Sequence, residues 1–330
     1  MRALVITTHG NPDVLKVQER PDPRPAHGEV LVRVRAAGVN FADVMARMGL
    51  YPDAPKPPSV VGYEFAGEVE GTGARVMGGS RFGAYAEQVA VSEAQLLPLP
   101  DDWSFEEGAA FPVNYATAYA GLIRYGAVHA GERVLLHAAA GGVGIAATQI
   151  AKILGAEVYG TASASKHDAI RGFGVDHPID YRANDFVTEV RRISGEEQPL
   201  DLVMDALGGR NWKKSFSLLR AGGRLVPFGA SQLVSGDKRS IPTALRTLAE
   251  TPRFNPIKLA SESKAVIGLN MLKLWDSKGS LDEFIEPLAA WVGEGRVRPI
   301  VAQAFPLEQG PDAHRFLQER KNVGKVVLTL

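Results

Sequence analysis

The segment His137–Ser163 reads HAAAGGVGIAATQIAKILGAEVYGTAS, and its pattern indicates the architecture of the chain. It continues an apolar run that begins at Arg133 and has the length of a β-strand. After a glycine-rich turn, apolar residues recur at helical spacing between Ile145 and Leu154, and Glu157–Thr161 is a second strand-like run. Strand, turn, helix and strand make a βαβ unit, which predicts a parallel β-sheet.

The glycine turn of this unit has the form Ala139-x-Gly141-x-x-Gly144, with alanine at the first of its three small positions. Backbone without side chains can approach a pyrophosphate closely, and the N-terminus of the following helix offers unpaired N–H groups and a partial positive charge. The alternative is a glycine-rich turn in another kind of α/β protein, but the position between a strand and a helix supports a dinucleotide. The residues expected to contact it are Ala140, Gly141, Gly142 and Val143.

The composition excludes several classes of function. The chain has 330 residues, so two domains are expected, and its 45% hydrophobic and 22% charged residues are ordinary for a soluble globular protein. The formal net charge is zero, so neither a nucleic acid nor a membrane is expected as a partner. The absence of cysteine excludes disulfides, thiolate catalysis and cysteine-ligated metals. No apolar run has the length of a membrane span, and a cytoplasmic location is expected.

The first hundred residues are predicted to form a β-rich unit. Polar and apolar residues alternate in Glu29–Ala37 and in Tyr85–Val91, and proline and glycine are frequent between such runs. A short helix is expected near Phe41–Met48. Ser104 and Glu107 have the spacing of a capping box, which predicts that helices begin there and lead into the glycine turn.

Strand-like and helix-like segments alternate beyond the glycine turn, which predicts a doubly wound parallel sheet. The expected strands are Asp176–Asp180, Leu200–Ala206, Arg224–Phe228 and Ala265–Leu269, and the expected helices are Asp185–Ile193 and Trp212–Leu219. Helices over Leu281–Val292 and Pro311–Lys321 and strands over Pro299–Phe305 and Lys325–Leu330 are expected to follow.

Seven motifs spread over nearly the whole chain carry a family resemblance. They are AAGVNFADVMARMGLYP (Ala36–Pro52), VVGYEFAGEVE (Val60–Glu70), FPVNYATAY (Phe111–Tyr119), HAAAGGVG (His137–Gly144), DALGG (Asp205–Gly209), LLRAGGRLVPFG (Leu218–Gly229) and NVGKVVL (Asn322–Leu328). With these motifs the chain resembles the zinc-independent medium-chain dehydrogenases/reductases of the quinone oxidoreductase (zeta-crystallin-like) branch. Its C-terminal half is most similar to the vesicle-membrane-protein subgroup of that branch.

The resemblance implies an α/β fold in two parts. A GroES-like, β-rich catalytic domain would comprise residues 1–112 and 272–330, and a Rossmann domain that binds NADPH would comprise residues 113–271. It also implies a homodimer in which the strand near Ile267 pairs with its copy across the interface.

The residue types at the expected metal position predict that no metal is bound. Zinc enzymes of this superfamily have a cysteine where this chain has Asn40, and a histidine where it has Tyr63 before Glu64. An amide and a phenol are poor zinc ligands. We interpret Glu64 as a residue that stabilises the fold rather than one that takes part in the reaction.

The end of the strand Glu157–Thr161 favours NADPH over NADH. NAD-binding proteins of this type hold the ribose hydroxyls with a carboxylate about 20 residues after the glycines, and this chain has Ser163, Ser165 and Lys166 there instead. A carboxylate would repel a 2′-phosphate, whereas hydroxyls and an ammonium group attract it. The resemblance implies that Lys166 and Tyr181 hold this phosphate; the alternatives are a solvated lysine and a packed edge tyrosine.

The resemblance also assigns further cofactor contacts. Thr117 is expected near the pyrophosphate and nicotinamide, and Asn322 near the phosphates with Lys325 beside it, although Lys325 is equally consistent with a surface charge. The remaining expected contacts are Asn40, Leu207, Phe228, Gly229, Gly268, Leu269 and Asn270.

Four residues are candidates for the catalytic site. Asn40 is expected to contact the nicotinamide or the substrate through its amide, although it also suits the N-cap of the helix that follows. Asp43 and Tyr51 flank the cleft in the resembling enzymes, and Tyr63 is expected beside them. Tyr51 suits a hydrogen bond to a substrate carbonyl, or simple packing. We interpret His137, at the end of a strand, as structural.

These residues predict an NADPH-dependent, zinc-free quinone oxidoreductase. Hydride addition to a quinone produces a phenolate-type anion, which needs less stabilisation than the alkoxide that zinc supports. One alternative is reduction of an enone or alkenal double bond, because charge then develops on a delocalised enolate. A second alternative is an NADPH-binding scaffold with little turnover. The segment Ser231–Ser263 is either a lid on the substrate side or a variable surface insertion.

Overall fold

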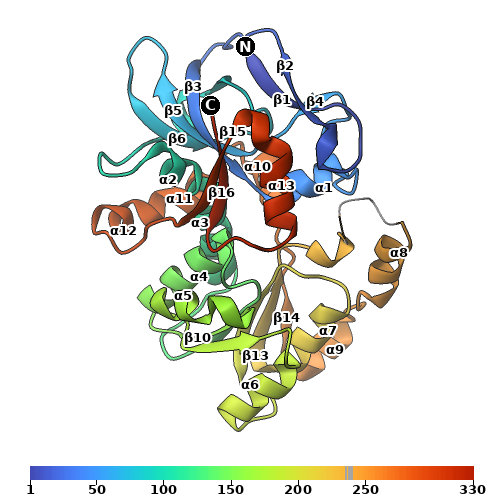
Figure 1. Cartoon of the computed structure of the whole chain (residues 1–330). Coiled ribbons are helices and arrows are strands. Elements are labelled where there is room, and N and C mark those ends of the chain that lie inside the picture. Colours follow the sequence, from blue (N-terminus) through green and yellow to red (C-terminus); the bar gives the residue numbers. More distant parts are fainter. Residues whose placement is uncertain (235, 237–240) are drawn as a thin grey trace.

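The computed structural model describes residues 1–234, 236 and 241–330, and places two β-rich parts one above the other (Figure 1). The lower part in Figure 1 contains a parallel sheet of six strands built from the middle of the chain. The upper part combines N-terminal strands with the last two strands of the chain. This is the expected GroES-like and Rossmann arrangement, and the fold prediction is confirmed.

The six-stranded sheet has the order β11-β10-β9-β12-β13-β14, and all its pairs are parallel. The strands are β9 (Arg133–Leu136), β10 (Glu157–Ala162), β11 (His177–Asp180), β12 (Leu200–Asp205), β13 (Leu219–Pro227) and β14 (Ala265–Val266). Numbered from β9, this is the order 3-2-1-4-5-6 of a dinucleotide-binding fold, so the direction of the windings changes between β9 and β12. A ligand is expected beyond the carboxyl ends of the strands at that point.

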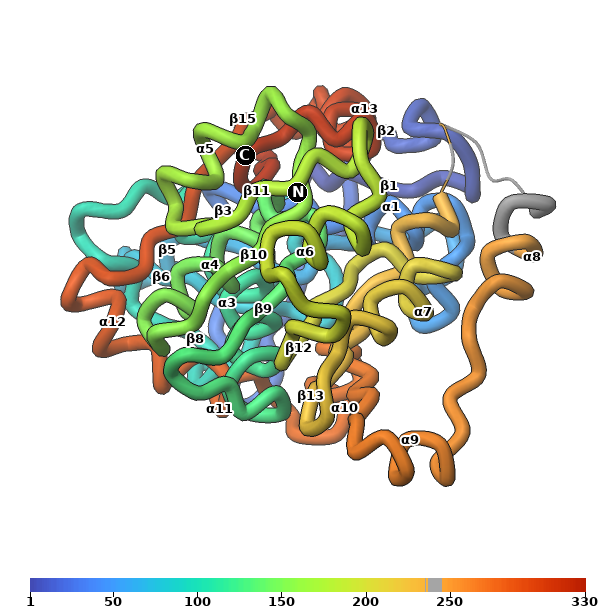
Figure 2. Tube along the Cα trace, turned by 90° about the horizontal axis from the view of Figure 1, so that it is seen from below, coloured from blue at the N-terminus to red at the C-terminus, as the bar shows by residue number. Residues whose placement is uncertain are grey.

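Helices cover both faces of this sheet (Figure 2). One face packs against α3 (Pro112–Tyr119), α4 (Gly142–Ile153) and α5 (His167–Gly172). The other face packs against α6 (Phe186–Ser194) and α7 (Arg210–Ser217). The sheet is therefore buried on both sides, which explains why its strands read as continuous apolar runs in the sequence.

The upper part contains a seven-stranded sheet and a three-stranded sheet. The larger sheet has the order β15-β16-β3-β5-β6-β8, with β7 paired to β3, and the smaller one has the order β2-β1-β4. The strands are β1 (Arg2–Ile6), β2 (Leu15–Glu19), β3 (Glu29–Val39), β4 (Ser59–Val60), β5 (Glu64–Val69), β6 (Arg75–Gly79), β7 (Gln88–Ser92), β8 (Leu96–Pro98), β15 (Val301–Pro306) and β16 (Lys325–Thr329). The helices α1 (Phe41–Arg47), α2 (Phe105–Ala109) and α13 (Gly310–Gln318) belong to the same part or border it.

Three elements of the structure differ from those expected from the sequence. Strand β13 begins five residues before the expected strand 224–228, and β14 ends at Val266 rather than Leu269. The helix expected over 281–292 is divided into α11 (Asp282–Ile285), a 3₁₀ turn and α12 (Ala289–Gly293), because Pro287 lacks the N–H that a continuous helix needs. The remaining helices are α8 (Ile241–Glu250), α9 (Pro256–Glu262) and α10 (Met271–Lys278). Part of the segment 231–263, including Arg239, lies outside the described residues.

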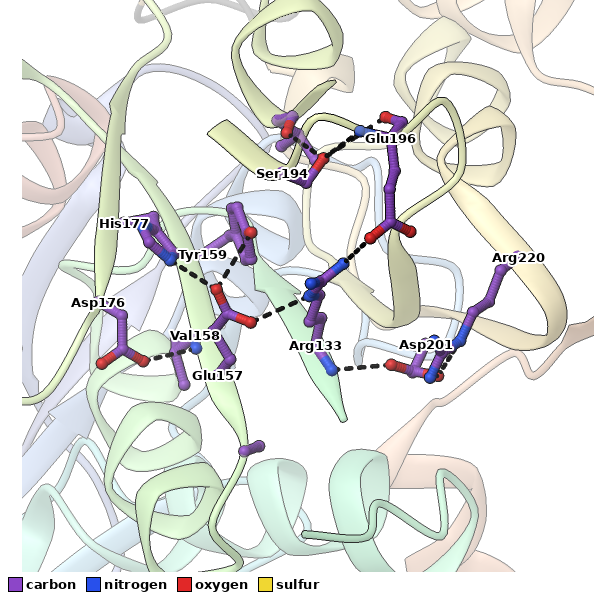
Figure 3. A network of polar contacts seen from close by, with 12 residues as sticks. Arg133, Glu157, Val158, Tyr159, Asp176, His177, Ser194, Glu196, Asp201 and Arg220 are labelled. Carbon is purple, nitrogen blue, oxygen red and sulfur yellow. Dashed lines mark hydrogen bonds and ion pairs between the residues drawn. The ribbon is translucent and has the colours of Figure 1, made fainter. Parts of the chain in front are cut away.

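A polar network joins the amino ends of the parallel strands (Figure 3). Arg133 at the start of β9 donates from its backbone N–H to Asp201 at 2.8 Å and from its guanidinium to Glu157 at 3.0 Å and Glu196 at 2.7 Å. Asp176 accepts from the N–H of Val158 at 2.8 Å. These contacts pair the charged side chains at the amino ends of the strands, opposite the end that carries the glycine turn. They therefore support the register of β9, β10 and β12.

Gly144 is the position in the glycine turn where a side chain fits least. A Cβ atom there would lie 2.5 Å from the carbonyl oxygen of Ala138 and 2.6 Å from the Cα of Ala139, and both of these are backbone atoms. We expect Gly144→Ala to lower the free energy of unfolding by about 2 to 3 kcal/mol, because helix and strand must move apart. Urea denaturation measures this loss.

Gly172 provides the control because it is also helical and nothing lies within 4 Å of its added Cβ. Gly172→Ala is expected to leave the protein equally stable or to stabilise it by about 0.5 to 1 kcal/mol. Equal unfolding free energies for the two variants would contradict the close packing at Gly144.

Candidate active site

A cavity of about 700 Å³ lies at the predicted position. Its wall includes residues that follow β9, β10, β12, β13 and β14, together with residues of the GroES-like part and the loop before β16. This volume is within the range of small-molecule sites. The cavity therefore combines the switch point of the parallel sheet with the inner surface of the β-rich part.

The structure brings nearly all the predicted site residues to this cavity. Every residue predicted to bind the cofactor is in its wall, and so are three of the four catalytic candidates. These are Asn40, Tyr51, Tyr63, Thr117, Ala140, Gly141, Gly142, Val143, Ser163, Lys166, Tyr181, Leu207, Phe228, Gly229, Gly268, Leu269, Asn270 and Asn322. Asp43 is the exception.

Asp43 lies behind the cavity wall rather than in it, which corrects the expectation that it flanks the cleft. Its side chain has no exposure, and it accepts hydrogen bonds from the N–H groups of Asn40 (2.8 Å) and Gly62 (3.1 Å) and from the hydroxyl of Tyr85 (2.9 Å). Burial raises the pKa of Asp43 to about 7. Its contacts give it a structural role, because they fix the start of α1 and hence the position of Asn40.

The glycine turn presents the N-terminus of α4 to the cavity. Gly141 is the N-cap residue and gives no side-chain cap, so the first-turn N–H groups of the helix are available to an anionic ligand. The loop before β16 closes on this turn, because the N–H of Gly324 donates to the carbonyl of Ala140 at 2.8 Å. Asn322 holds that loop by donating its amide to the carbonyl of Gly324 at 2.8 Å.

A cationic cluster occupies one end of the cavity. Lys166 Nζ donates to the carbonyls of Arg320 (2.7 Å) and Asn322 (2.6 Å), and within the described chain neither Lys166 nor Arg320 forms an ion pair with a carboxylate. Burial and the charges of Arg182 and Arg320 lower the pKa of Lys166, against an opposing effect of Tyr181. Although burial opposes it, hydrogen bonding from Arg320 and Arg182 lowers the pKa of Tyr181. This uncompensated positive charge suits a phosphate group.

A buried ion pair lies beside Asn40. Lys325 Nζ is 2.5 Å from the Glu64 carboxylate and donates to Asn40 Oδ1 at 2.6 Å, and Asn40 Nδ2 donates to Glu64 at 2.9 Å. The other carboxylate oxygen of Glu64 accepts from the N–H of Val113 at 2.8 Å. Lys325 is only 4% exposed and Glu64 is fully buried, so the interpretation of Lys325 as a surface charge is wrong. The two partners fix the orientation of the Asn40 amide.

The other end of the cavity is mostly apolar. Its wall there includes Met45, Leu272 and Trp275 together with the two tyrosines Tyr51 and Tyr63. The Tyr51 hydroxyl makes a long hydrogen bond of 3.4 Å to Asn270 Oδ1. Burial raises the pKa of Tyr51 to about 12, so this hydroxyl keeps its proton at neutral pH. This end can hold an apolar molecule that carries a hydrogen-bond acceptor.

His137 is buried and belongs to the wall of the cavity, next to the glycine turn. Its ring nitrogens lie 3.1 Å from the hydroxyls of Thr161 and Ser215, and its ring packs edge-on against Phe186. Burial lowers the pKa of His137, against the effect of Asp205. The neutral ring in a closed set of partners agrees with the structural interpretation.

Arg320 and Trp275 are among the cavity residues that were not assigned from the sequence. Arg320 follows α13 in a left-handed conformation (φ 56°), and Trp275 lies on α10. Neither belongs to a motif with a known spacing. The local signal for Arg320 is its position two residues before Asn322, whereas only the packing of α10 on the β-rich part brings Trp275 to the cavity.

Comparisons with known proteins agree with this geometry. Residues 26–101 match the alcohol dehydrogenase GroES-like domain, and residues 173–328 match the family described as zinc-binding dehydrogenase. A synaptic vesicle membrane protein VAT-1 homolog of Danio rerio is 40% identical over 339 residues, which cover 99% of this chain and 70% of the relative.

Two solved structures extend the comparison. The Escherichia coli quinone oxidoreductase, crystallised in complex with NADPH, has a TM-score of 0.86 at 30% identity and full coverage of both chains. The CurK enoyl reductase has a TM-score of 0.84 at 27% identity, with 99% of this chain and 98% of that chain covered. The chain belongs to the medium-chain dehydrogenase/reductase family.

The buried ion pair gives a direct test of the site's framework. We expect Lys325→Met to lower the free energy of unfolding by about 3 to 5 kcal/mol, because the Glu64 carboxylate would stay buried without its cation. The double variant Glu64→Gln/Lys325→Met is expected to recover a large part of that loss. Denaturant titration measures both.

Lys321→Met is the matched control, since the side chain of Lys321 is 60% exposed. It is expected to change stability by less than about 0.5 kcal/mol. A Lys325→Met protein as stable as this control would show that the pair does not hold the site together.

Proposed function

We propose that this protein is an NADPH-dependent, zinc-free oxidoreductase that transfers hydride to a quinone. The observation that carries the proposal is one continuous cavity with two different ends. One end has a helix N-terminus and uncompensated cations, which suit a phosphorylated dinucleotide. The other end is apolar with phenolic hydroxyls, which suits a planar carbonyl acceptor.

The residues present fit NADPH. The glycine turn leaves the first turn of α4 free of side-chain caps, and Lys166, Tyr181 and Arg320 gather where a 2′-phosphate would lie. When bound, the nicotinamide supplies the hydride, and the protein supplies its orientation. Asn40 retains one Nδ2 hydrogen for a ligand, because the other Nδ2 hydrogen is donated to Glu64, while Oδ1 accepts from Lys325. The NADPH complex of the similar E. coli enzyme supports this assignment.

The chemistry of the same residues supports a site without zinc. Within the described residues there is no group of three or more His, Cys, Asp or Glu side chains that could hold a metal. The Lys325 ammonium also occupies the space between Asn40 and Glu64, where it would repel a metal ion. A quinone does not require such an ion, because its reduced anion is delocalised and weakly basic.

Reduction of an enone or alkenal is the second candidate. The structural similarity to the CurK enoyl reductase favours it, and the same cavity could hold an α,β-unsaturated carbonyl compound. A scaffold role with little turnover is a third candidate, because the similar protein of Danio rerio is named as a synaptic vesicle membrane protein VAT-1 homolog and this name states no reaction. Asn40 and Tyr51 remain in the cavity wall and argue against loss of activity.

A homodimer also belongs to this proposal. Strand β14 lies at the edge of the six-stranded sheet and pairs with β13 alone within the described chain. A second copy could pair with its free edge and extend the sheet.

No helix among the described residues is long and apolar enough to cross a membrane.

Steady-state NADPH oxidation at 340 nm tests the acceptor class. We expect turnover of 9,10-phenanthrenequinone and 1,4-benzoquinone, slower turnover of 2-cyclohexenone and a 2-alkenal, and none of a saturated aldehyde. The described residues include no group of His, Cys, Asp or Glu side chains that could hold a metal to stabilise an alkoxide, so the aldehyde is the negative control. Faster turnover of the enone would favour the second candidate, and tight NADPH binding without any turnover would favour the scaffold.

The cationic cluster predicts the cofactor preference. We expect Lys166→Ala and Arg320→Ala each to raise KM for NADPH by about 10-fold or more and to leave KM for NADH nearly unchanged, because only NADPH carries the 2′-phosphate. Arg171→Ala is the control, since that exposed arginine pairs with Asp168 on the same segment. Equal effects on both cofactors would contradict the assignment of this phosphate site.

A further inference from the structure

The Tyr63 hydroxyl differs from the other buried tyrosine hydroxyls of the chain. Tyr63 is 8% exposed and lines the cavity, and its ring packs against Phe82 with centroids 5.3 Å apart. The hydroxyl is buried and has no hydrogen-bond partner among the described residues. By contrast, the hydroxyls of Tyr85 and Tyr115 donate to Asp43 at 2.9 Å and Gln149 at 2.6 Å.

An unpartnered buried hydroxyl destabilises a folded protein, because the group has lost its hydrogen bonds to water and gained none. A phenylalanine would fill the same space without that cost. The hydroxyl therefore has no evident structural purpose in the fold. An unpartnered group that costs stability and belongs to a residue of a cavity wall is expected to find its partner in the ligand.

We propose that the Tyr63 hydroxyl donates a hydrogen bond to the acceptor oxygen on which negative charge develops during hydride transfer. This inference rests on the proposed function. It adds the residue that stabilises the charge, and it restricts the substrate to an acceptor whose carbonyl oxygen reaches Tyr63 while its body contacts the apolar wall of Met45, Leu272 and Trp275.

With NADPH bound, the nicotinamide would supply a hydride and both electrons and end as NADP⁺: its C–H bond would break, an O–H bond would form at one quinone oxygen, and the negative charge of the hydroquinone monoanion would be left on the other oxygen, beside Tyr63. The Tyr63 O–H shares its proton with that oxygen without losing it, and a proton from water completes the hydroquinone. Burial raises the pKa of Tyr63 far above its usual value, so the hydroxyl is a donor throughout the neutral range.

Tyr63→Phe in the full-length protein tests the inference with two acceptors. We expect kcat/KM to fall about 10-fold for 9,10-phenanthrenequinone and about 100-fold for 2-cyclohexenone, because a more basic developing anion depends more on its donor. The loss should lie mainly in kcat, and KM for NADPH should stay within about 2-fold.

Stability provides the readout that separates a catalytic role from a structural one. Because the substitution removes an unpartnered hydroxyl, the Tm of the free Tyr63→Phe protein should be unchanged or raised by about 1 to 3 °C. Tyr119→Phe, in α3 and outside the cavity wall, is the matched control and should keep both activity and acceptor preference.

Two results would overturn the inference while leaving the proposed function intact. One is an active Tyr63→Phe protein with unchanged kcat/KM for both acceptors, and the other is an equal loss for both acceptors together with a lower Tm. If the unmodified protein turns over none of the acceptors, the proposed function fails, and the role of Tyr63 fails with it.

Discussion

The buried carboxylate of Glu64 is the point on which the arrangement of the site depends. It receives the Lys325 ammonium from β16, the Asn40 amide from the loop before α1, and the Val113 N–H at the start of α3. A charge this deeply buried is tolerated only when its partners are in place. One side chain therefore joins the N-terminal strands, the C-terminal strand and the first helix of the Rossmann part, and it does so at the wall of the cavity.

Several polar groups elsewhere in the described chain have a full set of partners, although buried atoms without a partner also occur on Gln88 and His314. Arg133 at the amino ends of the parallel strands has three acidic partners, and Asp43 has three donors. At the cavity, by contrast, Lys166 and Arg320 form no ion pair with a carboxylate of the described chain, and the Tyr63 hydroxyl has no partner there. The excess positive charge suits a phosphate, and the free donor suits an oxyanion. In the proposed function, these two ends are the cofactor side and the substrate side of one site.

The sequence predicted the fold and most of the residues that the structure brings together in the cavity wall, because both depend on local patterns. The glycine turn, the alternating strands and helices, and the motifs around Thr117, Phe228 and Asn322 are short and have a physical reason for their spacing. The predictions that failed depend on packing between distant segments. Nothing near Lys325 in the sequence shows that it meets Glu64, and nothing near Asp43 shows that Tyr85 and Gly62 enclose it. Trp275 was missed for the same reason.

A single-turnover experiment tests the central claim most directly. NADPH is bound to an excess of the protein, the complex is mixed rapidly with 9,10-phenanthrenequinone, and the absorbance at 340 nm is followed. The account predicts complete oxidation of the bound NADPH in one fast phase, and much slower oxidation when NADH replaces it. Oxidation no faster than in a mixture without protein would contradict the claim that this cavity transfers hydride from NADPH to a quinone.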